Sequence, residues 1–148
     1  MPPDSTGTFN NLYKQPDFYY GLDVRPEFVD FFSERDLTGL TALDLGCGEG
    51  RYALFLGHKG CRVTAVDRSK SGLAKLAQAA QAEDLPISTR LFDIADFDFP
   101  QNSFDIVVAA TVLDHLEDPL RNNTIEGIQT SVKPGGIAYV NVFTIDDP

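Results

Sequence analysis

The stretch TALDLGCGEGR at residues 41–51 decides the fold that we expect for this chain. It joins an apolar run typical of a buried strand to a carboxylate, three alternating glycines and an amphipathic run, residues 51–56, that opens a helix. Glycines let the backbone turn sharply and approach a ligand where a Cβ atom would collide. The stretch therefore predicts a loop that holds a nucleotide-type cofactor; the alternative is a purely structural turn.

The spacing of the glycines argues against a dinucleotide. The pattern is D-x-G-x-G-x-G, whereas a dinucleotide loop has the form G-x-G-x-x-G and would need a glycine where this chain has Arg51. Asp44 would also repel an arriving pyrophosphate, but it would favour a cationic or zwitterionic ligand. We therefore expect a cofactor without phosphates, which disfavours a nucleotide-dependent oxidoreductase.

Two further segments fit the same site. Residues 62–67, RVTAVD, read as a second buried strand that ends in an acid roughly 20 residues after the glycines. The carboxylate of Asp67 can there accept both ribose hydroxyls of an adenosine. A third strand, residues 88–92, is followed by Asp93, which can accept an adenine amino group, and by Ile94, which can pack on the ring. An ordinary loop or capping carboxylate is the alternative for Asp93.

The rest of the pattern indicates the fold class. Residues 104–109 form a nearly continuous apolar run, which is typical of a central strand covered on both faces. Strands and helices alternate without linkers or repeats, which predicts one doubly wound α/β unit with a mainly parallel, Rossmann-like sheet and helices on both faces. Ligands of such sheets bind at the carboxyl ends of the strands, where Asp44, Asp67 and Asp93 converge with Ala110.

Taken together, residues 40–143 resemble the class I S-adenosylmethionine-dependent methyltransferases. Within that class the chain is most similar to the tellurite-resistance methyltransferases. The narrower match rests on YGL at residues 20–22, LDLGCGEGR at 43–51, and KPGG at 133–136 leading to TIDDP at 144–148.

The resemblance implies S-adenosylmethionine as cofactor and methyl transfer to a small-molecule acceptor such as a chalcogen oxyanion or a thiol. The end of the fourth strand would lie beside the methionine part of the cofactor. The residues expected to bind the cofactor are Asp44, Gly46, Cys47, Gly48, Gly50, Arg51, Asp67, Arg68, Asp93, Ile94 and Ala110.

No catalytic residue carries over from the family, and His115 is the one candidate. It follows Asp114 just past the fourth strand, near the expected position of the methyl group, where it could deprotonate an acceptor. The alternative is a residue that only helps to frame the pocket. Methyl transfer from a sulfonium needs an in-line nucleophile more than an acid, and a soft anionic acceptor would need no base.

The family pattern extends beyond the end of this sequence. A complete class I fold has two more strands and acceptor-binding segments after the fifth strand, whereas this sequence stops at Pro148. We therefore expect a sheet truncated after the fifth strand, and a cofactor-binding module without independent activity is an alternative function. The last strand, residues 137–143, should then form an apolar edge that recruits a second copy or is covered by further residues.

Composition narrows the classes of partner. The formal net charge is −10, with 22 acidic and 12 basic residues and no basic cluster, so we expect neither nucleic acid nor an acidic membrane surface as partner. No apolar run approaches the roughly 20 residues of a membrane span, and the first residues lack a signal-peptide core. We expect a cytoplasmic protein in which Cys47 and Cys61 are reduced thiols, with no metal site.

The segment before the glycine loop, residues 1–39, is the expected N-terminal part, and residues 40–148 are the cofactor-binding domain. Residues 1–16 should be loosely ordered. Residues 23–35 read as an amphipathic helix with three phenylalanines on its buried side, namely Phe28, Phe31 and Phe32. The pair Tyr19 and Tyr20 could cover the cofactor as part of a lid, or could be plain core.

Overall fold

The computed structural model describes residues 5–146 and contains one five-stranded sheet in the order β3-β2-β1-β4-β5. Every neighbouring pair of strands is parallel, which confirms the predicted fold class. The strands are β1 (Thr41–Leu45), β2 (Arg62–Asp67), β3 (Ile87–Leu91), β4 (Phe104–Ala110) and β5 (Val132–Asn141).

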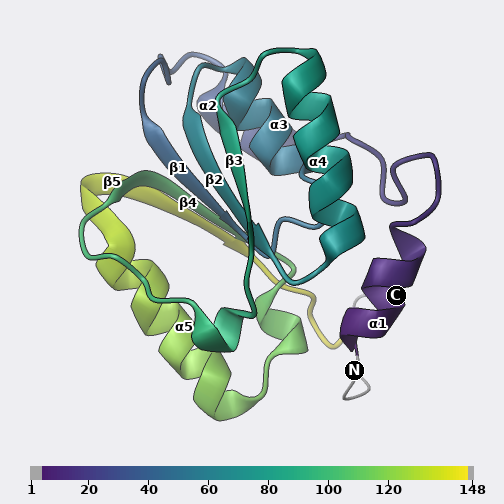
Figure 1. The fold of residues 1–148 in the computed structure, drawn as a ribbon. Coiled ribbons are helices and arrows are strands. Elements are labelled where there is room, and N and C mark those ends of the chain that lie inside the picture. Colours follow the sequence, from purple (N-terminus) through teal and green to yellow (C-terminus); the bar gives the residue numbers. More distant parts are fainter. Residues whose placement is uncertain (1–4, 147–148) are drawn as a thin grey trace.

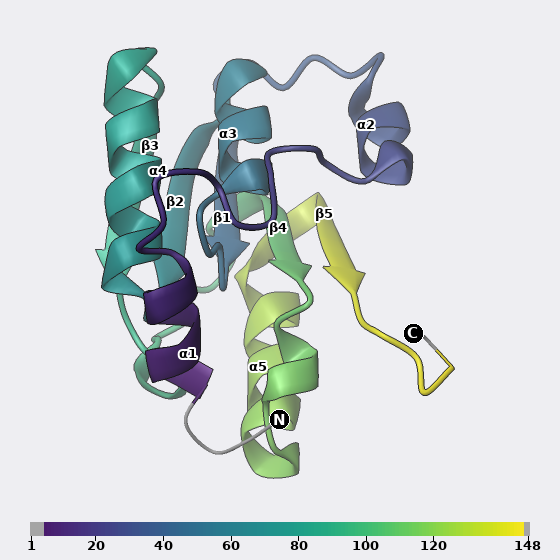
Figure 2. The ribbon, with the colours of Figure 1, turned by 90° about the vertical axis from the view of Figure 1, so that its right-hand side faces the viewer.

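Helices cover both faces of the sheet, as predicted (Figure 1). The helices α2, α3 and α4 lie on one face and α5 on the other (Figure 2). Each face has its own apolar cluster, one around Phe28 and Leu56 and one around Val107 and Ile128. The helices are α1 (Ser5–Leu12), α2 (Pro26–Phe32), α3 (Arg51–His58), α4 (Lys70–Ala82) and α5 (Asp118–Ser131).

The strand order places a crevice between β1 and β4. The chain proceeds from β1 outward through β2 to β3, and then returns to the other side of β1 for β4 and β5. The connections that leave β1 and β4 therefore diverge at the carboxyl ends of these strands, where parallel sheets bind their ligands. Four consecutive residues of β4, residues 106–109, are buried, which explains the continuous apolar run in the sequence.

The prediction that residues 1–16 are loosely ordered is wrong for the part that the structure describes. Residues 5–12 form α1, and Tyr13, which follows it, is only 7% exposed. Asn10 fixes the helix against the start of α4, because its side-chain oxygen accepts a hydrogen bond from the backbone N–H of Ser71 at 2.9 Å. Residues 1–4 lie outside the described residues. The ordered helix could not be predicted from the local sequence, because the residue that α1 contacts lies about 60 positions further along the chain.

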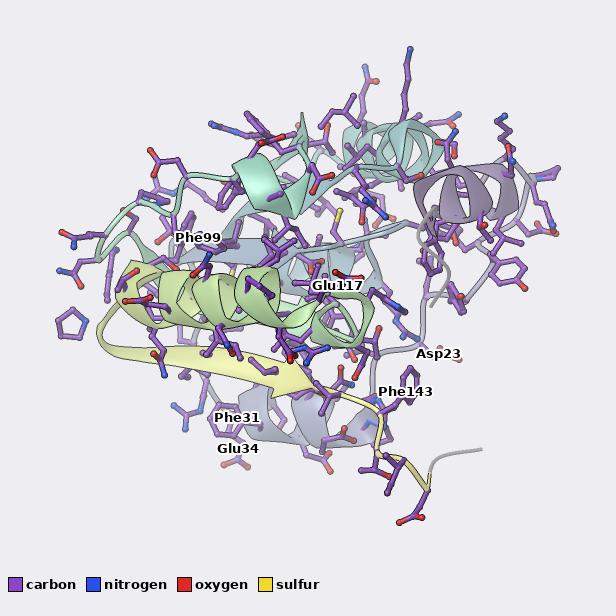
Figure 3. The ribbon with its side chains drawn as sticks, turned by 90° about the horizontal axis from the view of Figure 1, so that it is seen from below. Asp23, Phe31, Glu34, Phe99, Glu117 and Phe143 are labelled. Carbon is purple, nitrogen blue, oxygen red and sulfur yellow. The ribbon has the colours of Figure 1, made fainter. Side chains whose placement is uncertain are left out.

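The predicted helix at residues 23–35 is shorter, and one of its phenylalanines is misassigned. The helix α2 begins at Pro26, because the residue before a proline avoids helical backbone. Phe28 and Phe32, four residues apart, are fully buried against the sheet, but Phe31 is 48% exposed and lies on the outer side of α2 (Figure 3). The guanidinium of Arg35 covers the Phe31 ring at 4.3 Å instead.

The last strand begins earlier than predicted. We expected a turn at residues 133–136 and a strand at 137–143, whereas β5 starts at Val132 and ends at Asn141. The pairing with β4 is irregular between Phe104 and Ile106, and this irregularity accommodates the Pro-Gly-Gly segment within the strand. The prediction that this strand forms an edge of the sheet is confirmed. Within residues 5–146, none of the helices combines the length and the apolar character needed to cross a lipid bilayer.

Candidate active site

A cavity of about 890 Å³ lies at the carboxyl ends of the strands. Its walls come from the loop after β1, the ends of β2 and β4, the segment after β3 and the N-terminal residues before α2. All the residues that we expected from the sequence to bind the cofactor line this one cavity, together with the catalytic candidate His115. Their contact with a cofactor stays a prediction.

The loop after β1 needs its glycines for two different reasons. Gly48 has a φ of +57°, and a Cβ atom there would lie 2.9 Å from the hydroxyl of Tyr13, at the wall of the cavity. Gly50 has a φ of +89°, and a Cβ atom there would lie 2.4 Å from the side chain of Leu76, in the core under α4. Gly48 therefore leaves room beside the cavity, whereas Gly50 allows α3 and α4 to pack.

The Asp44 carboxylate is buried at the end of β1. It is 2% exposed and accepts a hydrogen bond from the backbone N–H of Ala53 at 3.0 Å, in the first turn of α3. The pKa of Asp44 is raised to about 7, mainly by burial and also by the negative charge of Asp67, although the hydrogen bond from Ala53 opposes the rise. A cationic group in the cavity would favour the ionised form, because it would compensate for the lost solvation.

The Asp67 carboxylate connects the end of β2 to the glycine loop. Its Oδ2 accepts a hydrogen bond from the backbone N–H of Gly48 at 2.9 Å, and its Oδ1 accepts one from Ser69 at 2.7 Å. Burial is the largest influence and raises the pKa of Asp67 above its ordinary value. A carboxylate offers about four acceptor positions, so Asp67 keeps acceptor capacity for a hydroxyl group of a ligand.

The segment after β3 carries Asp93 and Ile94 into the cavity wall. The Oδ1 of Asp93 accepts a hydrogen bond from the backbone N–H of Ala95 at 3.0 Å and thus caps a short 3₁₀ helix, residues 94–96. Its Oδ2 lies 3.5 Å from the guanidinium of Arg68. Asp93 is therefore a capping carboxylate, as in the alternative considered above, and also a residue of the cavity wall.

The N-terminal segment closes one side of the cavity through residues that the sequence did not single out. Tyr13 lines the wall, and burial raises the pKa of its hydroxyl. The Glu49 carboxylate, in the glycine loop, pairs with the ammonium of Lys75 and accepts a hydrogen bond from the backbone N–H of Tyr19 at 2.6 Å. Lys75 also donates to the carbonyl of Asp17 at 2.5 Å. No short-range pattern could reveal these contacts, because their partners are 26 or more residues apart.

Of the two tyrosines suggested as a lid, only one belongs to the cavity wall. Tyr20 lines the cavity, whereas Tyr19 does not, and the two rings pack edge to face at 4.8 Å. Both side chains are about half exposed, at 46% for Tyr19 and 53% for Tyr20, so neither is part of the core.

His115 lies at the other end of the cavity, after β4. Its ring packs edge-on against Phe9 at 5.5 Å, and its Nδ1 is buried without a hydrogen-bond partner among the described residues. Burial lowers the pKa of His115 below its ordinary value, although the charge of Asp114 opposes this. The ring is therefore neutral at pH 7. Figure 3 shows Glu117 and Phe143, two further residues of the cavity wall, at this end of the sheet.

Both cysteines are free thiols, as predicted, and burial raises the pKa of each. No three His, Cys, Asp or Glu side chains within residues 5–146 come together in a way that could hold a metal ion.

Comparison with known proteins gives one consistent result. Residues 42–136 match a family model described as a methyltransferase domain. The chain is 33% identical over 125 residues to a ubiquinone biosynthesis O-methyltransferase of Chromobacterium violaceum, covering 82% of this chain and 52% of the relative. It is 35% identical over 106 residues to a probable S-adenosyl-L-methionine-dependent methyltransferase, TehB, of Haemophilus influenzae, covering 71% and 37%.

A solved structure of TehB from Haemophilus influenzae superposes with a TM-score of 0.70 at 27% identity, covering 91% of this chain and 44% of that one. The chain spans about half or less of the length of these relatives.

Proposed function

Because this chain belongs to the methyltransferase domain family, we propose that its cavity binds S-adenosylmethionine for the transfer of a methyl group to a small molecule. One observation carries the proposal. The buried carboxylate of Asp44 and the partly buried carboxylate of Asp67 line the same cavity on either side of a glycine loop. The cofactor has a cationic amino-acid end and a ribose, which suit two carboxylates, and it lacks the phosphates that they would repel.

Each wall residue has a role that suits one part of the cofactor. Asp44 would attract the methionine ammonium, and Asp67 would accept from the ribose hydroxyls with its remaining acceptor capacity. Asp93 and Ile94 would contact the adenine, while Gly46, Cys47 and Gly48 would contact the ligand from the loop after β1. Ala110 would border the methionine part, and the remaining predicted contacts are Gly50, Arg51 and Arg68.

The bound cofactor supplies an electrophilic methyl group on a sulfonium, and the protein has to align an acceptor with it. The neutral His115, whose Nδ1 has no hydrogen-bond partner among the described residues, could accept a proton or a hydrogen bond from a hydroxyl or thiol acceptor. An anionic chalcogen acceptor would need no such base.

Isothermal titration with S-adenosylmethionine, S-adenosylhomocysteine and NAD tests the cofactor assignment. We expect saturable binding of the first two and none of NAD. Binding of NAD alone would overturn the assignment of S-adenosylmethionine as cofactor and would favour the alternative of a nucleotide-dependent oxidoreductase.

For the acceptor we propose a chalcogen oxyanion or a thiol. The support is the resemblance of three sequence segments to the tellurite-resistance methyltransferases and the similarity to TehB. A turnover assay with selenite, tellurite, small thiols and a catechol separates this class from a hydroxyl acceptor. Turnover of the catechol alone would contradict the proposal. Cofactor binding without any turnover would favour the alternative of a binding module.

We also propose that residues 5–21 act as a lid. In Figure 2, α1 lies beside the ends of the strands below α4. Tyr13 and Tyr20 form part of the wall, and Glu49 fastens the segment through Lys75 and the N–H of Tyr19. The ion pair is largely buried, with side-chain exposures of 15% for Lys75 and 5% for Glu49. Neutralising either partner would therefore leave the charge of the other buried and unpaired.

The change Glu49→Gln keeps an acceptor for Tyr19 but removes the charge that Lys75 needs. We expect faster hydrogen exchange in residues 13–21 and faster dissociation of S-adenosylhomocysteine. The matched control is Glu83→Gln, which removes a carboxylate from an exposed pair with His58 on the surface. Equal effects of both changes, or none from Glu49→Gln, would contradict the lid.

Finally, we propose pairing of two copies along the edge strand β5. Apolar side chains are exposed along and just after this strand, with Val140 at 44%, Val142 at 50% and Phe143 at 53%. Analytical ultracentrifugation should find a concentration-dependent dimer that the change Val140→Lys weakens. A monomer at every concentration would contradict this pairing.

A further inference from the structure

Thr111 has a backbone conformation that its side chain disfavours. Its φ is +55°, in the left-handed region, and it directly follows β4 at the wall of the cavity. The other non-glycine residues with positive φ in the described part of the chain are Asp84 and Asn102. Aspartate and asparagine tolerate this region, whereas a β-branched residue is strained there. The surrounding structure must therefore hold Thr111 in place.

Asn141, the last residue of β5, supplies the restraint. The backbone N–H of Thr111 donates to the side-chain oxygen of Asn141 at 2.8 Å and to its backbone carbonyl at 3.1 Å. The pairing of β4 with β5 ends at this point, with Asn141 opposite Ala110. The side-chain amide thus extends the contact between the strands by one residue, at the position where the chain must turn.

The turn at Thr111 decides where the following residues go. Val112 packs back on the glycine loop, since a Cβ atom at Gly46 would lie 2.5 Å from its Cγ2. The backbone N–H of His115 then donates to the carbonyl of Val112 at 3.2 Å and closes a short 3₁₀ turn. This turn delivers the imidazole of His115 to the cavity with its Nδ1 unpartnered among the described residues.

We propose that Asn141 is a positioning residue that holds Thr111 in the left-handed conformation and thereby orients His115 at the acceptor end of the cavity. Asn141 itself does not line the cavity, so it acts through Thr111. The link from Asn141 through Thr111 to His115 is inferred from these contacts alone. The role of His115 in acceptor binding rests on the proposed function.

The decisive test is rescue by glycine. Asn141→Ala removes the side-chain bond and leaves only the longer bond to the backbone carbonyl, so the strain at Thr111 should then turn the following residues away. Thr111→Gly removes the strain, because glycine adopts positive φ freely. We expect Asn141→Ala to displace the imidazole resonances of His115, and the double variant with Thr111→Gly to return them to their wild-type positions. His58, the other of the two histidines, lies at the end of α3 and is an internal control whose resonances should not move.

Every outcome of this experiment decides something. Unchanged His115 resonances in Asn141→Ala, or a double variant that stays as displaced as the single one, would overturn the proposal. If Asn141→Ala does not fold, a folded double variant with wild-type His115 resonances supports it, and an unfolded double variant overturns it. Titration of the wild type with S-adenosylhomocysteine separates this link from the proposed function. Absence of binding by the wild type would refute the proposed function but leave the link between Asn141 and His115 standing.

Discussion

The two ends of the cavity are built in different ways. At the β1–β2 end, main-chain N–H groups of the glycine loop and of the first turn of α3 donate to the carboxylates of Asp67 and Asp44, which stand at the ends of neighbouring strands. At the β4–β5 end, the loop that carries His115 is held by side chains from other elements: Asn141 holds Thr111, and Arg121 donates to the carbonyls of Leu113 and Leu116. The first end is built from one short stretch of sequence and an acid at the end of the next strand. The second end combines local contacts of Arg121 with the long-range contact between Asn141 and Thr111, which only the fold brings together.

This difference predicts which changes affect which end. Changes in the glycine loop should alter both the free energy of unfolding and the affinity for the cofactor. The reason is that the backbone of this loop packs against the core and also forms part of the cavity wall. Changes around the His115 loop should leave cofactor affinity intact.

The largest effect should come from Gly50→Ala. The new Cβ atom would meet Leu76 in the core, and the residue would keep its left-handed backbone. Left-handed strain and overpacking together should lower the free energy of unfolding by roughly 2–5 kcal/mol in urea denaturation. Gly39→Ala is the matched control, because Gly39 has a φ of +76° with no atom within 4 Å of a new Cβ, and it should cost only about 1–2 kcal/mol. Equal losses would show that packing against Leu76 is unimportant.

Asp67→Ala should weaken the binding of S-adenosylhomocysteine by roughly 1.5–3 kcal/mol in isothermal titration, the usual size for hydrogen bonds to a charged acceptor. The change also leaves the N–H groups of Gly48 and Ser69 without their acceptor. Asp36→Ala removes a carboxylate that accepts from Thr38 outside the cavity wall, and should not alter binding. An unchanged dissociation constant in folded Asp67→Ala would remove Asp67 from the site.

The affinity for S-adenosylhomocysteine should also depend on pH through Asp44. The pKa of Asp44 in the free protein is about 7, and a cationic ammonium favours the ionised form, so binding should release a proton and weaken as the pH falls. The expected loss is about tenfold between pH 8 and pH 6. In Asp44→Asn the affinity should be lower and independent of pH over this range. A slope that persists in the variant would assign the titration to another group, such as Asp67, whose pKa burial also raises.

The smallest effect should come from Arg121→Lys at the β4–β5 end. The guanidinium donates to two backbone carbonyls at once, that of Leu113 at 3.1 Å and that of Leu116 at 2.5 Å. The ammonium of a lysine cannot reproduce this planar, two-point geometry. We expect a loss of about 1 kcal/mol in the free energy of unfolding and displaced His115 resonances, with unchanged affinity for S-adenosylhomocysteine. Weaker cofactor binding in this variant would show that the two ends of the cavity are coupled.

The sequence alone determined the parallel sheet and the glycine-loop end of the cavity. The physical reason is that a glycine loop between a buried strand and a helix is specified by neighbouring residues. The backbone turn and the nearby carboxylate both depend on residues 41–51. The acids at the ends of the next strands could be assigned to the same place, because parallel strands end at one edge of a sheet.

Tertiary structure alone decided the order of the N-terminal segment and the construction of the His115 loop. The anchor of α1, the ion pair between Glu49 and Lys75, and the hold of Asn141 on Thr111 each join residues 26 to 61 positions apart. Likewise, only packing decided that Phe28 is buried and Phe31 exposed, since the face of a short helix that meets the sheet depends on where the helix begins. Such contacts form between side chains that carry no local pattern, so they exist only once the sheet has brought their elements together.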